Sequence, residues 1–152
     1  QNSRRSQLSQ VWAKIIGDFY GLNINTFSGG IEITACNERS INSLFRLGFN
    51  IKNLGGENPL YEIKYADKKP PITLFSKLYE DPPNPKTGFA AVICCSHADE
   101  NCPFIPGVEK RISLPYEDPK TFDDTTIESK MYDQLSIQIA TEMKFIIGGL
   151  LI

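Results

Sequence analysis

The chain opens with Gln1-Asn2-Ser3-Arg4-Arg5-Ser6-Gln7, and an amphipathic helical pattern of apolar residues begins immediately after it. The first backbone N–H groups of a helix have no partner within the helix, and the helix dipole adds positive charge at the same end. Such a junction is suited to bind an anion. Arg5 adds a guanidinium group that can hold a tetrahedral oxyanion through two parallel hydrogen bonds. The alternative is an ordinary polar helix start with two solvated arginines.

The composition is that of one globular domain, which we expect to span residues 1–152. The chain is 41% hydrophobic and 22% charged, and its length is sufficient to bury a core without disulfides. The formal net charge of −2 gives no reason to expect nucleic acid or a membrane surface as a partner. No apolar run approaches the roughly eighteen residues that cross a bilayer. Four cysteines without a signal-peptide pattern favour a reducing cytoplasm.

Hydrophobic periodicity predicts alternating helices and strands in the first part of the chain. The predicted elements, in order, are a helix from Arg5 to about Tyr20, a strand at Asn23–Ser28, a helix capped by Asn37 and ended at Gly48, and a strand at Phe49–Leu54. Their expected buried faces include Phe19 in the first helix and Phe45 and Leu47 in the second. This alternation is typical of a parallel sheet flanked by helices.

The second part of the chain begins with a hairpin-like excursion at Leu60–Thr87, which contains two β-rich runs, Tyr61–Tyr65 and Ile72–Phe75. The continuous apolar run Phe89–Cys95 predicts a central strand buried on both faces, and a short strand is expected at Lys110–Leu114. Thr125 and Glu128 match a capping box that starts a last helix, whose expected buried face runs from Met131 to Ile147 and includes Phe145. We therefore predict a doubly wound α/β fold with a mostly parallel four-stranded sheet, helices on both faces and an inserted β-hairpin-like segment.

Two cysteines occur on one polar loop, Cys95-Ser96-His97-Ala98-Asp99-Glu100-Asn101-Cys102. Cys95 is expected at the carboxyl end of a central strand, where open α/β sheets bind their ligands. The spacing does not match a tight redox pair, and the loop lacks the second ligand pair of a structural zinc site, so we expect no metal. The two thiols can meet if the loop rearranges, because closing so short a segment costs little. The alternative is one buried and one incidental cysteine.

The remaining candidates are judged by their neighbours in the sequence. Asp118, followed by Pro119, can project a carboxyl group over the site as a general acid, although most loop Asp-Pro pairs are turns or caps. His97 is expected to be exposed and non-catalytic. Cys36 and Cys94 are expected to serve packing.

Together these stretches resemble the low-molecular-weight protein tyrosine phosphatase superfamily. Asn2-Ser3-Arg4-Arg5-Ser6-Gln7 looks like the end of its phosphate-binding loop, and Ser28-Gly29-Gly30-Ile31-Glu32 looks like its second-strand signature. The segment from Cys95 to Pro106 is very similar to the resolving-cysteine loop of the thioredoxin-coupled arsenate reductases in that superfamily. Tyr116-Glu117-Asp118-Pro119 resembles their general-acid loop. The resemblance covers nearly the whole chain apart from the excursion at Leu60–Lys86.

The resemblance implies roles for individual residues. An oxyanion would bind on the loop of Asn2, Ser3, Arg4, Arg5 and Ser6. The catalytic residues would be Arg5, Cys95, Cys102 and Asp118, and a disulfide would end on the Cys95 and Cys102 pair. The family's nucleophilic cysteine lies six positions before the loop arginine, which places it two residues before Gln1, so we expect the natural chain to continue upstream with a strand and this cysteine. Arg4 departs from relatives among the reductases, which often carry another cysteine there.

The implied activity is reduction of arsenate to arsenite, with a thioredoxin-like reductant as partner and no cofactor. One alternative is a phosphatase that hydrolyses phosphotyrosine or other aryl phosphates, because arsenate and phosphate share shape and charge. A third interpretation is a non-catalytic oxyanion-binding protein, which applies if the upstream cysteine is absent.

Overall fold

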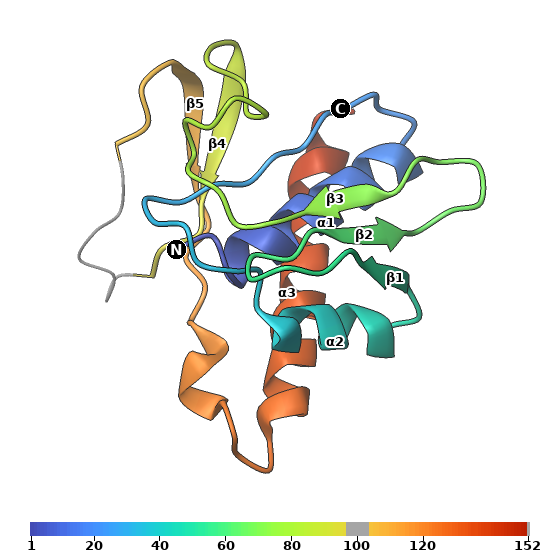
Figure 1. The fold of residues 1–152 in the computed structure, drawn as a ribbon. Coiled ribbons are helices and arrows are strands. Elements are labelled where there is room, and N and C mark those ends of the chain that lie inside the picture. Colours follow the sequence, from blue (N-terminus) through green and yellow to red (C-terminus); the bar gives the residue numbers. More distant parts are fainter. Residues whose placement is uncertain (97–103, 152) are drawn as a thin grey trace.

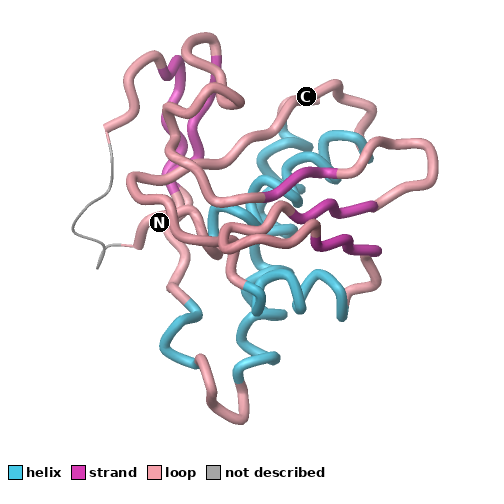
Figure 2. The backbone as a smooth tube through the Cα atoms, viewed as in Figure 1, coloured by secondary structure: helices cyan, strands magenta, loops and turns pink. Residues whose placement is uncertain are grey.

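The computed structural model describes residues 1–96 and 104–151, which form a mixed α/β fold. Figure 1 labels the elements and Figure 2 marks helices, strands and loops along the same backbone. The helices are α1 (Arg5–Phe19), α2 (Glu38–Arg46), α3 (Glu128–Gly149) and the 3₁₀ turn η1 (Pro119–Phe122). The strands are β1 (Asn50–Asn53), β2 (Tyr61–Lys64), β3 (Ile72–Leu74), β4 (Phe89–Ile93) and β5 (Val108–Ser113).

Three strands form an antiparallel sheet in the order β1-β2-β3. Ile63 of β2 pairs with Ile51 of β1 on one side and with Ile72 of β3 on the other. The two β-rich runs of the predicted hairpin-like excursion therefore form an antiparallel pair, β2 and β3. The strand predicted at Phe49–Leu54 also forms, but it joins this antiparallel sheet and not a parallel one.

The predicted four-stranded, mostly parallel sheet is wrong for the described part of the chain. Parallel pairing there is confined to β4 with β5, whose register places Val92 opposite Ile112, and to one isolated bridge between Gly30 and Leu78. The prediction that Phe89–Cys95 is buried on both faces is also wrong, because Ala90 is exposed and Phe89 is half-buried. A two-stranded sheet leaves such a strand with one unpaired edge.

The predicted strand at Asn23–Ser28 does not form. Its side chains alternate between exposed and more buried positions, as a strand's would, but the segment lies along α1. Lys14 Nζ donates a hydrogen bond to the carbonyl of Ile24 at 2.8 Å. Thr26 Oγ1 donates to the carbonyl of Gln10 at 3.0 Å. Contact with a helix on one side gives the same alternation as a sheet face, so the pattern alone could not distinguish them.

The predicted helices form with nearly the expected bounds. Asn37 caps α2 as predicted, since its Oδ1 accepts the backbone N–H of Arg39 at 2.9 Å. The capping box of Thr125 and Glu128 is wrong. The Glu128 carboxylate accepts the backbone N–H of Asp124 at 2.9 Å, and the Thr125 hydroxyl donates to the carbonyl of Phe122.

The core joins α1, α3 and the antiparallel sheet around side chains that are fully or almost fully buried. These residues are Leu8, Val11, Leu44, Ile63, Leu74, Tyr116, Tyr132 and Ile139. Three aromatic side chains predicted to be buried are exposed to solvent, namely Phe19 (72%), Phe45 (67%) and Phe145 (84%). Leu47, also predicted to be buried, is 38% exposed. Each lies at the edge of an apolar helix stripe that is wider than its contact with the core.

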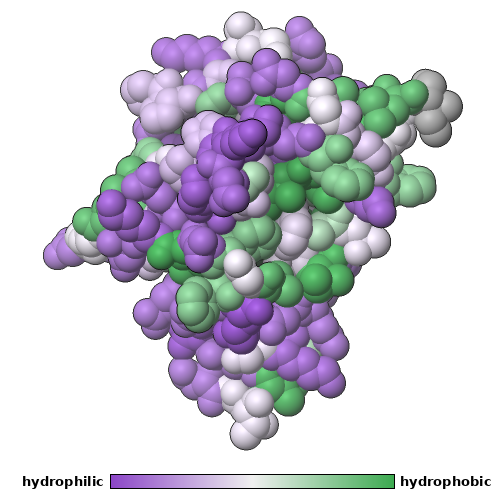
Figure 3. All heavy atoms as spheres, turned by 90° about the vertical axis from the view of Figure 1, so that its right-hand side faces the viewer, coloured by the Kyte–Doolittle hydropathy of each residue, from purple (hydrophilic) through white to green (hydrophobic). Residues whose placement is uncertain are grey.

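The surface carries further apolar side chains near the C-terminal end of α3. Leu150 is 69% exposed and Leu151 is 52% exposed. Figure 3 shows hydrophobic residues reaching the surface on a face whose other parts are largely hydrophilic. None of the described helices has the length and apolar character needed to span a bilayer.

Candidate functional site

Arg5, the first residue of α1, connects three segments that are distant in sequence. Its Nη1 donates to the carbonyl of Tyr116 at 3.0 Å and to the carbonyl of Cys94 at 3.4 Å. Its Nη2 lies 3.4 Å from Oδ2 of Asp118. The side chain is 16% exposed. The guanidinium group thus lies between the end of β4 and the segment that follows β5.

The end of β4 brings two cysteines to this place. Cys95 follows directly on Cys94, whose carbonyl accepts the Arg5 contact, and both are half-buried. Cys94 Sγ lies 3.4 Å from Ser9 Oγ on α1 and packs against the core, as predicted. Cys102 and His97 lie outside the described residues, so the pairing of Cys95 with Cys102 stays a prediction.

Asp118 has two contacts with different consequences. Its Oδ1 accepts the backbone N–H of Lys120 at 3.1 Å, which makes it the N-cap of η1. Its Oδ2 faces Arg5, and the side chain is 37% exposed. The residue is therefore both the local cap that an Asp-Pro pair usually is and a partly solvated carboxylate beside the predicted anion-binding arginine.

The N-terminal loop is held in shape by Asn2. Its Oδ1 accepts hydrogen bonds from Gln7 Nε2 at 2.9 Å and from the backbone N–H of Lys77 at 3.1 Å. Its Nδ2 donates to Ser6 Oγ at 2.9 Å, and the residue is fully buried. The carbonyl of Ser3 accepts the backbone N–H of Asn37 at 2.9 Å. The side chain of Asn2 thus shapes the loop, so an anion on this loop would have to use other donors.

The first turn of α1 has the electrostatic character expected of an anion site. Within the described residues, no side chain caps this turn and no acidic residue lies in it. The positive end of the helix dipole therefore lies at the same point as the Arg5 guanidinium group.

Gly30 packs directly against this loop, and its neighbour Gly29 packs against the backbone of Tyr79. A Cβ added at Gly29 would lie 2.4 Å from Cα of Tyr79, and one at Gly30 would lie 2.8 Å from the backbone N of Asn2. Neither space accepts a side chain without moving backbone. The close approach that the sequence predicted for these glycines is therefore present, and it supports the loop from behind.

Two buried groups, Cys36 and Lys77, lie next to the loop. Cys36 is 2% exposed, and burial raises the pKa of its thiol to about 12. Lys77 is 3% exposed, and burial lowers the pKa of its ammonium group, which lies 4.4 Å from the centre of the Phe75 ring. The prediction that Cys36 serves packing is confirmed.

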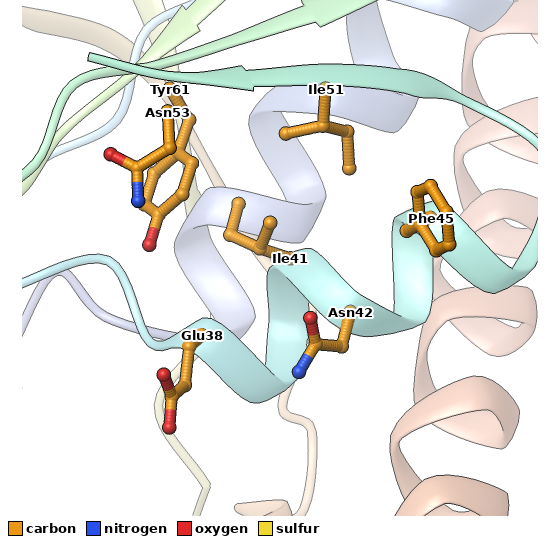
Figure 4. Close-up of a pocket in the computed structure, with 7 residues that line it drawn as sticks. All are labelled: Glu38, Ile41, Asn42, Phe45, Ile51, Asn53 and Tyr61. Carbon is orange, nitrogen blue, oxygen red and sulfur yellow. The ribbon is translucent and has the colours of Figure 1, made fainter. Parts of the chain in front are cut away.

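A surface hollow lies elsewhere, between α2 and the antiparallel sheet. Figure 4 shows it lined by residues of α2, β1 and β2, which are Glu38, Ile41, Asn42, Phe45, Ile51, Asn53 and Tyr61. None of the described site residues predicted from the sequence lines it. Among residues 1–96 and 104–151, no group of three His, Cys, Asp or Glu side chains is arranged to hold a metal ion.

Comparison with known proteins gives this geometry a family. The chain is 31% identical over 119 residues to arsenate reductase 2 of Staphylococcus haemolyticus (strain JCSC1435), a match that covers 78% of this chain and 72% of the relative. This chain belongs to the arsenate reductase family of the low-molecular-weight phosphatase superfamily. Another arsenate reductase of the family, from Staphylococcus aureus (strain Newman), is 30% identical over the same shares of both chains. One from Bacillus cereus (strain AH187) is 25% identical over 118 residues.

No protein-family model matches this chain.

Sequence reasoning missed a group of polar residues beside the candidate site of this chain. Arg4 Nε donates to Tyr132 Oη at 2.9 Å, and Arg4 Nη2 lies 3.3 Å from Asp123 Oδ2. These partners are more than a hundred positions away in the sequence, and no local pattern marks such pairs.

Proposed function

We propose that this protein reduces arsenate to arsenite through a relay of cysteines. The observation that carries the proposal is the position of Arg5, which contacts the Asp118 carboxylate and the carbonyl directly before Cys95. Similarity to arsenate reductases supports arsenate as the substrate. In this proposal Arg5 binds the anion, Asp118 is the acid and Cys95 is a reacting thiol, next to the carboxyl end of β4.

The oxyanion binds on the loop of residues 2–6. Backbone N–H groups at the start of α1 and the Arg5 guanidinium group hold its oxygens. Arg5 gives up its 3.4 Å contacts in exchange for charge-assisted hydrogen bonds to the anion. The nucleophile is a cysteine expected two residues before Gln1. The helix dipole and Arg5 stabilise its thiolate, which attacks arsenic, while Asp118 protonates the departing oxygen so that water leaves.

The redox step follows from this adduct. Cys95 attacks the sulfur bonded to arsenic, the S–As bond breaks, and its electron pair stays on arsenic, which leaves as arsenite. Arsenic gains two electrons and the two cysteines lose two in forming a disulfide. Cys102 then attacks Cys95, which moves the disulfide to the Cys95 and Cys102 pair and restores the first thiolate. A dithiol protein of the thioredoxin type reduces this pair, which fits a reducing compartment such as the cytoplasm.

The test uses the natural full-length chain with arsenate and a thioredoxin system. Cys95→Ser and Cys102→Ser each abolish turnover, whereas Cys94→Ser, a change at the adjacent packing cysteine, retains it. Mass spectrometry of the Cys102→Ser variant after one turnover shows a disulfide between Cys95 and the upstream cysteine. Turnover that persists in both Cys95→Ser and Cys102→Ser would refute the relay.

A phosphatase is the second candidate, and the same Arg5 and Asp118 contact favours it. Hydrolysis of an aryl phosphate needs the anion site and the acid but no second thiol, because water completes the reaction. If this is the main activity, hydrolysis survives Cys95→Ser and Cys102→Ser and is lost in Asp118→Asn. Identification of the residues encoded directly before Gln1 separates both enzymes from a non-catalytic oxyanion-binding protein.

A further inference from the structure

We propose that Arg4 and Asp123 form a clamp that positions the general-acid segment, residues 116–123, over the anion site. The inference rests on the proposed function, in which Asp118 is the acid. It assigns Arg4 and Asp123 as positioning residues that act through Asp118, and it gives Arg4 a role other than anion binding.

The two residues of the clamp contact each other and share a third side chain, Tyr132. Arg4 Nη2 lies 3.3 Å from Asp123 Oδ2, and Arg4 Nε donates to Tyr132 Oη at 2.9 Å. Tyr132 Oη in turn donates to Asp123 Oδ1 at 2.7 Å. Arg4 and Asp123 are 11% and 17% exposed, and Tyr132 is fully buried. Solvent screens an ion pair so shielded from water less than a surface pair, and removing one partner leaves a costly unpaired charge.

Consecutive arginines hold the two ends of one short turn. Arg5 contacts Asp118, which caps the start of η1, while Arg4 contacts Asp123, which follows its last residue. The 3₁₀ turn η1 spans the four residues between the two carboxylates. Fixing Asp123 therefore fixes where Asp118 can lie, since the turn is a short hydrogen-bonded spacer.

Asp123 is also the place where α2 meets this segment. Arg39 Nε lies 3.6 Å from Asp123 Oδ1, and the same side chain pairs with Asp124 and Glu128. Removing the Asp123 charge leaves Arg4 without its carboxylate partner at a largely buried place beside the anion loop. An unneutralised guanidinium group there can draw Asp118 or the substrate out of position, and a shift of about 1 Å can cost roughly 100-fold in rate.

The experiment compares Asp123→Asn with Asp124→Asn in the full-length enzyme reducing arsenate. Both variants lose one negative charge on the same segment, but the Asp124 side chain is 86% exposed and contacts Arg39, not Arg4. Asn also tolerates the positive φ of 63° at position 124. We expect kcat to fall about 10- to 100-fold in Asp123→Asn, with KM changed less than threefold, and both constants to stay near wild type in Asp124→Asn.

A double-mutant cycle separates positioning from general stability. If the clamp acts through Asp118, Asp123→Asn causes no further loss of kcat in an Asp118→Asn background. Additive losses, or equal losses in Asp123→Asn and Asp124→Asn, would overturn the proposal.

A readout without turnover distinguishes failure of the clamp from failure of the proposed function. Hydrogen exchange at the backbone N–H of Lys120, which Asp118 caps, is expected to accelerate at least fivefold in Asp123→Asn and not in Asp124→Asn. Faster exchange in a protein that does not reduce arsenate refutes the function and leaves the clamp intact. Unchanged exchange in a protein that does reduce arsenate refutes the clamp.

Discussion

The guanidinium group of Arg5 lies 3.4 Å from the carboxylate of Asp118, although 113 residues separate them in the chain. The contact joins the start of the first helix to the segment after the last strand, so the predicted anion-binding group and the predicted acid occupy one place. The carbonyl of Cys94 accepts a further hydrogen bond from the same guanidinium group.

Replacing Arg5 by lysine tests whether the shape of the cation matters. Arg5 serves the carbonyls of Tyr116 and Cys94 and the Asp118 carboxylate from one planar group, which a single ammonium group cannot reproduce. We expect Arg5→Lys to lower kcat/KM for arsenate by about 100-fold or more. Steady-state kinetics measure this, with the exposed Arg111→Lys on β5 as control. A loss of less than threefold would contradict the assignment.

Gly30→Ala tests the support behind the loop. The added methyl group meets the backbone of Gln1 and Asn2 at 2.9 and 2.8 Å, so the loop has to move. We expect weaker binding of arsenate or phosphate, by about tenfold, and a lower free energy of unfolding by about 1–3 kcal/mol. Calorimetric titration and urea unfolding measure the two effects.

Gly149→Ala is the matched control for this change. Nothing lies within 4 Å of the added atom there, and the residue is helical, so alanine leaves anion binding unchanged and stability equal or slightly higher. Equal anion affinity in Gly30→Ala and wild type would show that the loop does not depend on this close approach.

The buried thiol of Cys36 makes stability depend on pH in the alkaline range. Its pKa is raised from 9.0 to about 12 by burial, so between these values the folded chain keeps a proton that the unfolded chain releases. Stability is therefore lost as pH rises above 9, by up to about 1.4 kcal/mol per pH unit from this group. Urea unfolding at pH 8, 9.5 and 11 measures the slope.

Cys36→Ala isolates this contribution. Tyr65 and Tyr132, whose pKa values are raised to about 12, titrate in both proteins and cancel in the comparison. We expect a flatter decline of stability above pH 9 in the variant than in the wild type. Parallel curves would mean that Cys36 is accessible to solvent in the folded chain.

Local patterns predicted local structure well. The spacing of apolar residues gave α1 and α2 to within about a turn, and Asn37 was correctly predicted as a cap, because these features depend on neighbours three or four positions away. The β2–β3 hairpin and the strand β4 followed from β-rich runs between turn residues. The errors at Phe19, Phe45 and Phe145 arose because an apolar stripe does not reveal how much of it the core covers.

The sequence by itself determined which residues are chemically suited to the site: an arginine at a helix start, an acid before a proline, two cysteines on one loop, and two glycines where a loop must approach backbone closely. Residue type and near neighbours carry that information. The tertiary structure alone decided that Asn23–Ser28 lies on α1 and not in a sheet, that Arg5 reaches Asp118, and that Arg4 reaches Asp123 and Tyr132. Those outcomes depend on contacts between segments far apart in the chain, whose energies no local pattern contains.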